Sequence, residues 1–430
     1  MRRAIAFLIA ASTCGAYSAL SHEAIIDSVW KSHIQPLLLA KFPNATPDEL
    51  KEAHAYVYGG CQIQDLGYFP FSSHAFSDFA HYVRSGDFVT AMLHDAQTLD
   101  EYAFAIGALA HYTADRTAHP TINEAVGMIY PKLRHKYGPR PTYEDNPADH
   151  LKVEFSFDVV QVSRGLYAPD DYHDFIGFKV SKEVLERAFH DTYGIELKEI
   201  FKNIDLGIGT YRFAMGKLIP EMTKVAWDSK RSDIEKLSPG VTRTKFVYAL
   251  PQRQYNKEWD GKYKRPGPWT RFLAFIFRAI PTVGPFKVLS FKPVPDKAER
   301  AFLKSFELTV EAYKQELNAE RQRSLKLANY NLDTGKPVKP GDYRLADNAY
   351  ALLLDKASGH PISPELRKNI LDFFTQANLS EFSKKTISQL ERLKSDVASA
   401  SPTSPPLEFP PEEDTFPTAA ASTIRAHPNP

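Results

Sequence analysis

An uncharged run at residues 102–110 leads directly into His111 and Asp115, and its apolar residues recur at three- and four-residue spacing. That spacing predicts a buried helix that continues through Asp115. A carboxylate is costly to bury unless it is paired or binds a metal ion. The fold must therefore hold a polar pair in its interior, next to an apolar helix face.

The helical period recurs at residues 175–193 and 298–327, whereas clear alternation of polar and apolar residues is scarce. Residues 244–250 are the best candidate for a short strand. A turn at Pro43 is followed by a helix start that Thr46 caps. We therefore predict an all-α fold, with a helical domain and a further, mostly helical C-terminal region.

Composition limits the class of protein. The 430 residues are too many for one small core, and a hydrophobic fraction of 43% is ordinary for a globular protein. The 53 Lys and Arg residues balance the 52 Asp and Glu residues, so bulk charge does not favour a nucleic-acid partner. One cysteine, Cys61, follows the first 18 residues, which predicts a buried thiol rather than an internal disulfide.

Residues 1–18 are typical of a signal peptide, with two arginines, a short apolar run and small residues before a cleavage site after Ser18. A lipoprotein site at Cys14 is the alternative. We expect an exported protein, secreted or periplasmic, with membrane association as a further option.

Residues 236–295 interleave Pro, Gly, Arg and aromatic residues, and an apolar run at 272–280 has basic flanks. This segment is either a connection or a membrane-contact loop, and its apolar run is too short to span a bilayer. We divide the chain into a signal peptide (1–18), a helical domain (19–235), this segment (236–295), a helical region (296–400) and a disordered tail (401–430).

Histidines are concentrated in one part of the chain, because ten of the 14 lie in residues 22–150. His111 and Asp115 stand four residues apart, so on a helix they share one face and can bind one ion. His119 follows four residues later, where we expect Pro120 to end the helix, and it can reach a neighbouring ion. The spacing favours a metal site over a simple hydrogen bond between His111 and Asp115.

A second pair, His150 and Glu154, repeats the four-residue spacing. Further candidate ligands lie upstream at His22, Asp65 and His74. Eight nitrogen and oxygen ligands exceed what one four-coordinate zinc uses, and imidazole with carboxylate favours zinc or another first-row metal.

Two of these ligands have rivals in the sequence. His81 falls on the same helical face as His74 and is the alternative to it. His135 is a rival of His150, but no carboxylate stands four residues after it, so we prefer His150.

In this order, the candidate ligands resemble those of the zinc-dependent phospholipase C family, which is related in fold to the single-strand-specific S1/P1 nucleases. The chain is most similar to the branch that includes the phospholipase domain of glycosylphosphatidylinositol-specific phospholipase D. The resemblance covers residues 19–235, which it implies to be the catalytic domain. It rests on Ser21-His22, Asp65, Ser73-His74, His111-Tyr112-Thr113-Ala114-Asp115, His119 and His150-Leu151-Lys152-Val153-Glu154.

The resemblance implies a helical domain with a cluster of two to three zinc ions at the base of a cleft. The implied ligands are Asp65, His74, His111 and Asp115 for one ion; His119, His150 and Glu154 for the second; and His22, a bridging Asp115 and the mature N-terminal backbone for the third. The family often begins its mature chain with Trp, whereas the first Trp here is Trp30, so the third ion has the weakest support.

The implied activity is phosphodiester hydrolysis, most of all phospholipase C-type cleavage of a phospholipid headgroup by a zinc-bridging water. Asp65 or Glu154 would deprotonate or orient that water. Tyr68, Phe69 and Phe71 either line the cleft or pack in the core.

Two other functions compete with this one. An S1/P1-like nuclease would use the same metals, but the balanced charge argues against a nucleic-acid substrate. A non-catalytic, metal-stabilised binding protein is the third hypothesis, although structural zinc sites are usually closed and rich in cysteine.

Overall fold

The computed structural model describes residues 19–163, 177–215, 292 and 294–399, with a few positions between 227 and 243. Helices make up most of these residues, so the predicted all-α fold is confirmed. The expectations for the signal peptide, the strand at 244–250, the apolar run at 272–280 and the tail all lie outside the described residues.

The first part of the chain folds into a series of helices, with η1 a π-helix and η2 a 3-10 helix. In order they are α2 (Ala19–Val29), η1 (Trp30–Ile34), α3 (Gln35–Lys41), α4 (Pro47–Gly60), η2 (Ile63–Tyr68), α5 (His74–Tyr82), α6 (Ser85–Asp95), α7 (Leu99–Ile129), α8 (Pro131–Tyr137) and α9 (Pro147–Ser163). The predicted cap at Thr46 is confirmed, since its side chain and that of Glu49 form a capping box at the start of α4.

The second part adds more helices and one hairpin. The elements are α10 (Lys182–Tyr193), α11 (Leu197–Ile200), α12 (Ile204–Phe213), α17 (Asp296–Arg321), β1 (Tyr330–Asn331), β2 (Lys336–Pro337), α18 (Arg344–Ala357), α19 (Pro364–Thr375), η5 (Leu379–Glu381) and α20 (Lys384–Ser399). The strands pair antiparallel, with Tyr330 opposite Pro337. The helix predicted from residue 298 is α17, which ends earlier than the sequence period suggested.

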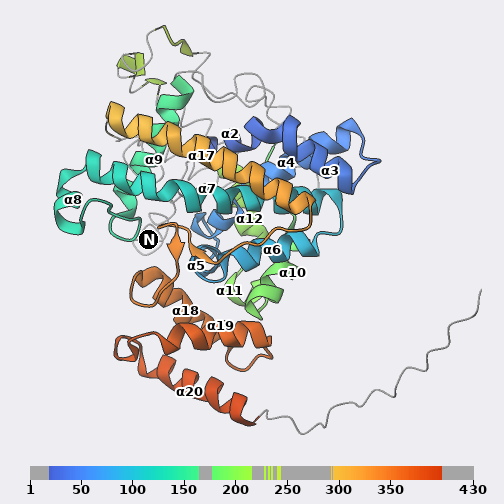
Figure 1. Ribbon diagram of the computed structural model, residues 1–430, viewed down its shortest axis with the longest axis vertical. Coiled ribbons are helices and arrows are strands. Elements are labelled where there is room, and N and C mark those ends of the chain that lie inside the picture. The colour runs from blue at the N-terminus through green and yellow to red at the C-terminus, as the bar shows by residue number, and fades with distance from the viewer. Residues whose placement is uncertain are drawn as a thin grey trace, which may run out of the picture.

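Helix α7 is the central helix, and α4 and α17 pack along it (Figure 1). Glycines allow α4 and α7 to approach closely where they cross. A Cβ on Gly107 would lie 2.1 Å from the carbonyl oxygen of Val57, and one on Gly60 would lie 2.0 Å from that of Phe104. This contact fixes the end of α4, and therefore η2, against the middle of α7.

Helix α7 continues through Pro120 to its end, so the expectation that this proline ends the helix is wrong. A proline in a helix leaves the carbonyl four residues earlier, here that of Arg116, without its helical N–H partner. That carbonyl faces Gly335, where a Cβ would lie only 2.4 Å from the Arg116 oxygen. Buried Ile122 and Val126 keep the later turns packed on the core, so α7 remains helical beyond the proline.

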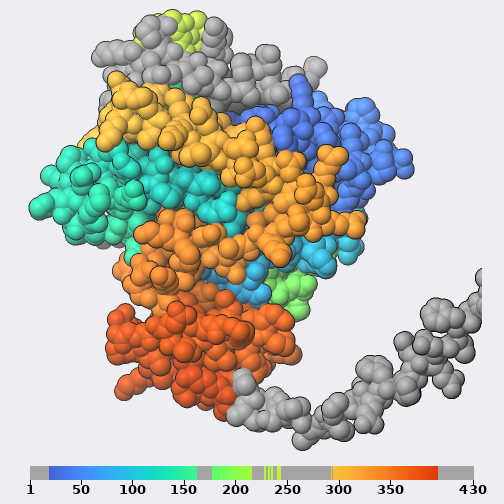
Figure 2. Space-filling view, viewed as in Figure 1, coloured from blue at the N-terminus to red at the C-terminus, as the bar shows by residue number. Residues whose placement is uncertain are grey.

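The C-terminal helices lie at two places in the molecule. Helix α17 runs along α7 and α2 and buries Phe302, Tyr313 and Leu317. Helices α18, α19 and α20 pack on one another, and α18 also contacts α5. They form the orange and red lobe at the lower end of the molecule in Figure 2. Among the described residues, no helix is both long and apolar enough to cross a membrane.

Candidate metal centre

Three buried groups of imidazole and carboxylate side chains gather around the middle of α7. In each group, the nitrogen or oxygen atoms that face one another all lie within 4.8 Å. The groups are His22, His111 and Asp115; Asp65, His81 and His111; and His119, His150 and Glu154.

Asp115 stands between the first two groups. Its Oδ1 lies 3.6 Å from Nε2 of His22, while its Oδ2 lies 3.1 Å from Nε2 of His111 and 3.4 Å from Nε2 of His81. Nε2 of His81 is also 3.4 Å from Oδ1 of Asp65. One carboxylate therefore faces ligands from α2, α5 and α7, which is the geometry expected of a bridging ligand.

The third group joins α7 to α9. Oε1 of Glu154 lies 2.8 Å from Nε2 of His150, one turn earlier on α9, and 4.0 Å from Nε2 of His119 on α7. The rings of His119 and His150 are 5.5 Å apart. The four-residue spacing of His150 and Glu154 thus places both on one buried helix face, as the sequence predicted.

Backbone carbonyls orient three of these rings through Nδ1. A carbonyl oxygen only accepts a hydrogen bond, so each Nδ1 donates its proton to the carbonyl and Nε2 is the ring nitrogen that faces the cluster. Such an outer contact is typical of metal-binding histidines. The contacts are His81 with Ser77 at 2.8 Å, His111 with Cys61 at 3.0 Å and His119 with Leu332 at 2.5 Å.

The pKa values of the buried groups follow from this crowding. Burial, reinforced by His111, lowers the pKa of His22 to about 3. Burial also holds the pKa of His150 well below its usual value, so both rings are neutral near pH 7. Burial, together with the nearby Asp115 and Asp65 carboxylates, raises the pKa of Glu154 well above its usual value. A divalent cation among these atoms would offset the repulsion between the carboxylates.

Several of the facing atoms are buried and make no hydrogen bond with any residue that the structure describes. They are Nε2 of His111, both carboxylate oxygens of Asp115, both ring nitrogens of His150 and Oε1 of Glu154. Buried polar atoms normally have a partner, and lone pairs that converge from imidazole and carboxylate groups suit a metal ion. The residues present therefore fit zinc.

The structure brings together seven of the eight ligands that we predicted from the sequence, and the exception is His74. This residue is exposed at the first position of α5, whereas His81 is buried at the other end of the same helix. Two helical turns separate them by about 10 Å, so only one can reach the cluster. His81, the alternative to His74, therefore takes its place beside Asp65 and Asp115. His135, the rival of His150, is exposed on α8.

Sequence reasoning missed Asp158, which holds the start of α2. Its Oδ2 accepts the backbone N–H of Leu20 at 3.2 Å, and its Oδ1 accepts the hydroxyl of Ser21 at 2.6 Å. Asp158 stands one turn after Glu154 on α9, and that spacing was the signal available in the sequence. Because His22 follows directly, Asp158 fixes the part of α2 that carries a candidate ligand.

Aromatic rings border the cluster. The ring of Tyr68 lies 6.0 Å from those of His81 and Tyr143, and the ring of Tyr143 lies 5.8 Å from that of His150. Phe69 is buried against other core residues. Of the three aromatic residues singled out in the sequence, Tyr68 therefore lies beside the candidate ligands and Phe69 belongs to the core.

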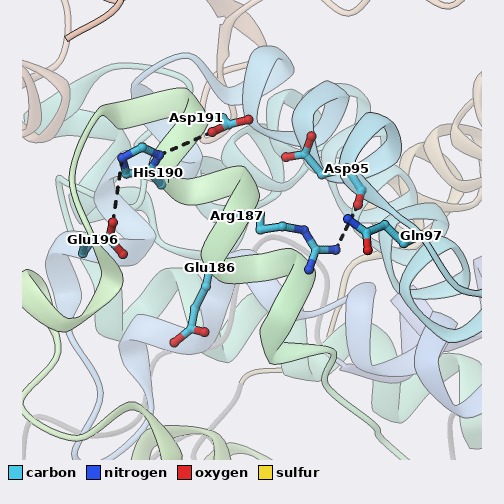
Figure 3. Close-up of a pocket in the computed structure, with 7 residues that line it drawn as sticks. All are labelled: Asp95, Gln97, Glu186, Arg187, His190, Asp191 and Glu196. Carbon is cyan, nitrogen blue, oxygen red and sulfur yellow. Dashed lines mark hydrogen bonds and ion pairs between the residues drawn. The ribbon is translucent and has the colours of Figure 1, made fainter. Parts of the chain in front are cut away.

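A separate polar hollow of about 330 Å³ lies between the end of α6 and α10 (Figure 3). Arg187 reaches across it to the carbonyl oxygen of Asp95 at 2.9 Å. None of its lining residues belongs to the three groups, so it is distinct from the candidate metal centre. The lining residues are Asp95, Gln97, Glu186, Arg187, His190, Asp191 and Glu196.

Comparison with known families agrees with this centre. The family model described as zinc dependent phospholipase C matches residues 21–203, a segment that contains all three groups. This match agrees with the resemblance to the zinc-dependent phospholipase C family that the sequence suggested. No curated protein and no solved structure matches the chain.

Proposed function

We propose that this protein is a zinc-dependent phosphoric diester hydrolase that cleaves the headgroup from a phospholipid. One observation carries the proposal: His81, His111 and His119 are each turned by a backbone carbonyl so that Nε2 faces buried carboxylates. They do so in a segment that matches the zinc-dependent phospholipase C family.

Zinc held by the three groups would supply positive charge for the phosphate oxygens and would make water more acidic. In the reaction, the oxygen of water bonds to phosphorus and the bond from phosphorus to the glycerol oxygen breaks. A diacylglycerol and a phosphorylated headgroup result. We assign the removal of the proton from water to a carboxylate oxygen of Asp65 or Glu154, because both are buried at the cluster.

The surroundings of the cluster support a lipid substrate. Phe71 lies three residues after Tyr68, is 47% exposed and has a φ of 65°. A non-glycine residue rarely adopts this conformation unless its surroundings impose it. The loop is held by the hydroxyl of Thr210, which donates to the carbonyl oxygen of Pro70 at 2.5 Å. A fixed, exposed aromatic side chain suits contact with a lipid surface.

The test combines metal analysis with a comparison of substrates. We expect the purified protein to contain two or three zinc ions per chain and to cleave phosphatidylcholine or phosphatidylinositol. Fewer than two ions would refute the metal centre. Cleavage of single-stranded DNA alone would favour the nuclease, and bound zinc without turnover on any substrate would favour a metal-stabilised binding protein.

A further inference from the structure

The segment that joins α17 to α18 lies outside the family match, yet it is attached to α6 and to α7, the helix that carries three candidate ligands. Asn329 caps α6, because its Oδ1 accepts the backbone N–H groups of Gly86 and Asp87 at 3.0 Å each. The hydroxyl of Tyr112 donates to the carbonyl oxygen of Ala328 at 2.6 Å. In Figure 1 the segment is an orange trace that crosses the bundle from α17 to the hairpin above α18.

Leu332 in this segment connects two candidate ligands from different groups. Its N–H donates to the carbonyl oxygen of His81 at 3.1 Å, and its own carbonyl oxygen accepts the proton of Nδ1 of His119 at 2.5 Å. One residue of the C-terminal region thus sets the orientation of the His119 ring and contacts the backbone of the helix that carries His81.

Asp333, the next residue, places a buried carboxylate beside the same ring. Its Oδ2 accepts the hydroxyl of Tyr82 at 2.7 Å and that of Tyr343 at 2.5 Å. Its Oδ1 lies 3.9 Å from Nδ1 of His119. The side-chain amide of Asn123, on α7, donates to its carbonyl oxygen at 2.9 Å. Two hydroxyls therefore fix the carboxylate and Asn123 fixes the backbone of Asp333, while Oδ1 lies on the side of His119.

We propose that Leu332 and Asp333 are part of the metal centre, and that Asp333, with the carbonyl of Leu332, is a positioning residue for His119. A carbonyl and a carboxylate behind a ligating imidazole fix its tautomer and make its other nitrogen a stronger ligand. The proposal rests on the metal binding that we propose above and not on the identity of the substrate. It means that the family segment alone does not contain the whole centre.

A role for Asp333 in folding alone would predict a different pattern of contacts. A carboxylate that only stabilises a turn usually accepts backbone N–H groups within a few residues of itself. The donors to Asp333 are instead the hydroxyls of Tyr82, at the end of α5, and Tyr343, just before α18. They hold the carboxylate between the helix of His81 and the ring of His119.

The test measures zinc affinity in the full-length protein by competition with a chromophoric chelator. Asp333→Asn keeps the shape of the side chain and removes its charge, and we expect one ion to bind about 10- to 100-fold more weakly. Tyr343→Phe removes one donor and keeps the carboxylate, so we expect a smaller change in the same direction. The matched control is Asn329→Ala, which loosens the same segment away from His119 and should leave zinc affinity unchanged.

Each result decides the proposal. Weaker binding of one ion in the Asp333 variant, with wild-type affinity in the Asn329 variant, supports it. Unchanged affinity in the Asp333 variant, or an equal loss in the Asn329 variant, refutes it, since the segment would then act only through general stability. A wild-type protein that binds no zinc would refute the proposed function and this inference together.

Discussion

Replacing Asp115 by asparagine is the most demanding test of the cluster, because this carboxylate faces two of the three groups. Oδ1 points to His22 and Oδ2 to His111 and His81. The change keeps the shape of the side chain but removes its charge from a fully buried position. Breaking a buried charge pair costs about 3–5 kcal/mol, which is roughly a 10²- to 10⁴-fold loss in affinity at 1.4 kcal/mol per factor of ten.

The loss should be confined to the two groups that Asp115 faces. His119, His150 and Glu154 form the third group without it, so we expect the variant to keep that ion and lose the others. Elemental analysis gives the zinc content per chain, and turnover on phosphatidylcholine gives the activity, which we expect to be abolished. Glu124→Gln is the control, because Glu124 lies on the same helix with its side chain 40% exposed. An Asp115 variant with full zinc content and full turnover would show that the cluster is wrongly assigned.

Three further predictions test single parts of the site. His81→Ala should lower zinc content and His74→Ala should not, and elemental analysis of the two variants would decide between these histidines; the reverse result would restore His74 as the ligand. Phe71→Ser should lower turnover on phospholipid vesicles more than on a short-chain monomeric phospholipid, since vesicles alone present a surface; an equal loss on both would remove Phe71 from lipid contact. Asp158→Asn should loosen the start of α2 and cost only the ion of the group with His22, measured as zinc per chain; unchanged zinc content would mean that α2 does not need this anchor.

The helical period and the four-residue spacings were enough to predict the all-α fold and most of the candidate centre. His111 with Asp115, and His150 with Glu154, lie on single helices, where sequence spacing fixes geometry. His74 and His81 share a helical face, so spacing could not separate them. What separates them is the depth of α5 in the fold, since only its far end reaches α7. The depth of a helix end in the fold depends on tertiary packing, which the spacing of residues in the sequence does not give.

The hydrogen bonds that orient the candidate histidines through Nδ1 were harder to predict from the sequence. Leu332 is 213 residues from the histidine that it orients, and no local pattern predicts such a pairing. Pro120 was misread for a related reason: the contact of Gly335 with the freed Arg116 carbonyl comes from the same distant hairpin. Helix geometry predicts that Pro120 leaves the carbonyl of Arg116 without its helical partner. It does not predict which distant segment lies against that carbonyl.

These long-range contacts would link the proposed metal binding to the packing of the described helices around α7. The histidines are oriented by carbonyls from α5, from the end of α4 and from the C-terminal hairpin, and those carbonyls are in place only when the helices have packed. A metal ion that binds the folded centre and not the unfolded chain stabilises every element that builds it. We therefore expect the hairpin and α17 to unfold together with the family segment, since Leu332 contacts two candidate ligands and α17 packs along α7. Activity should accordingly depend on residues well beyond the segment that the family model recognises.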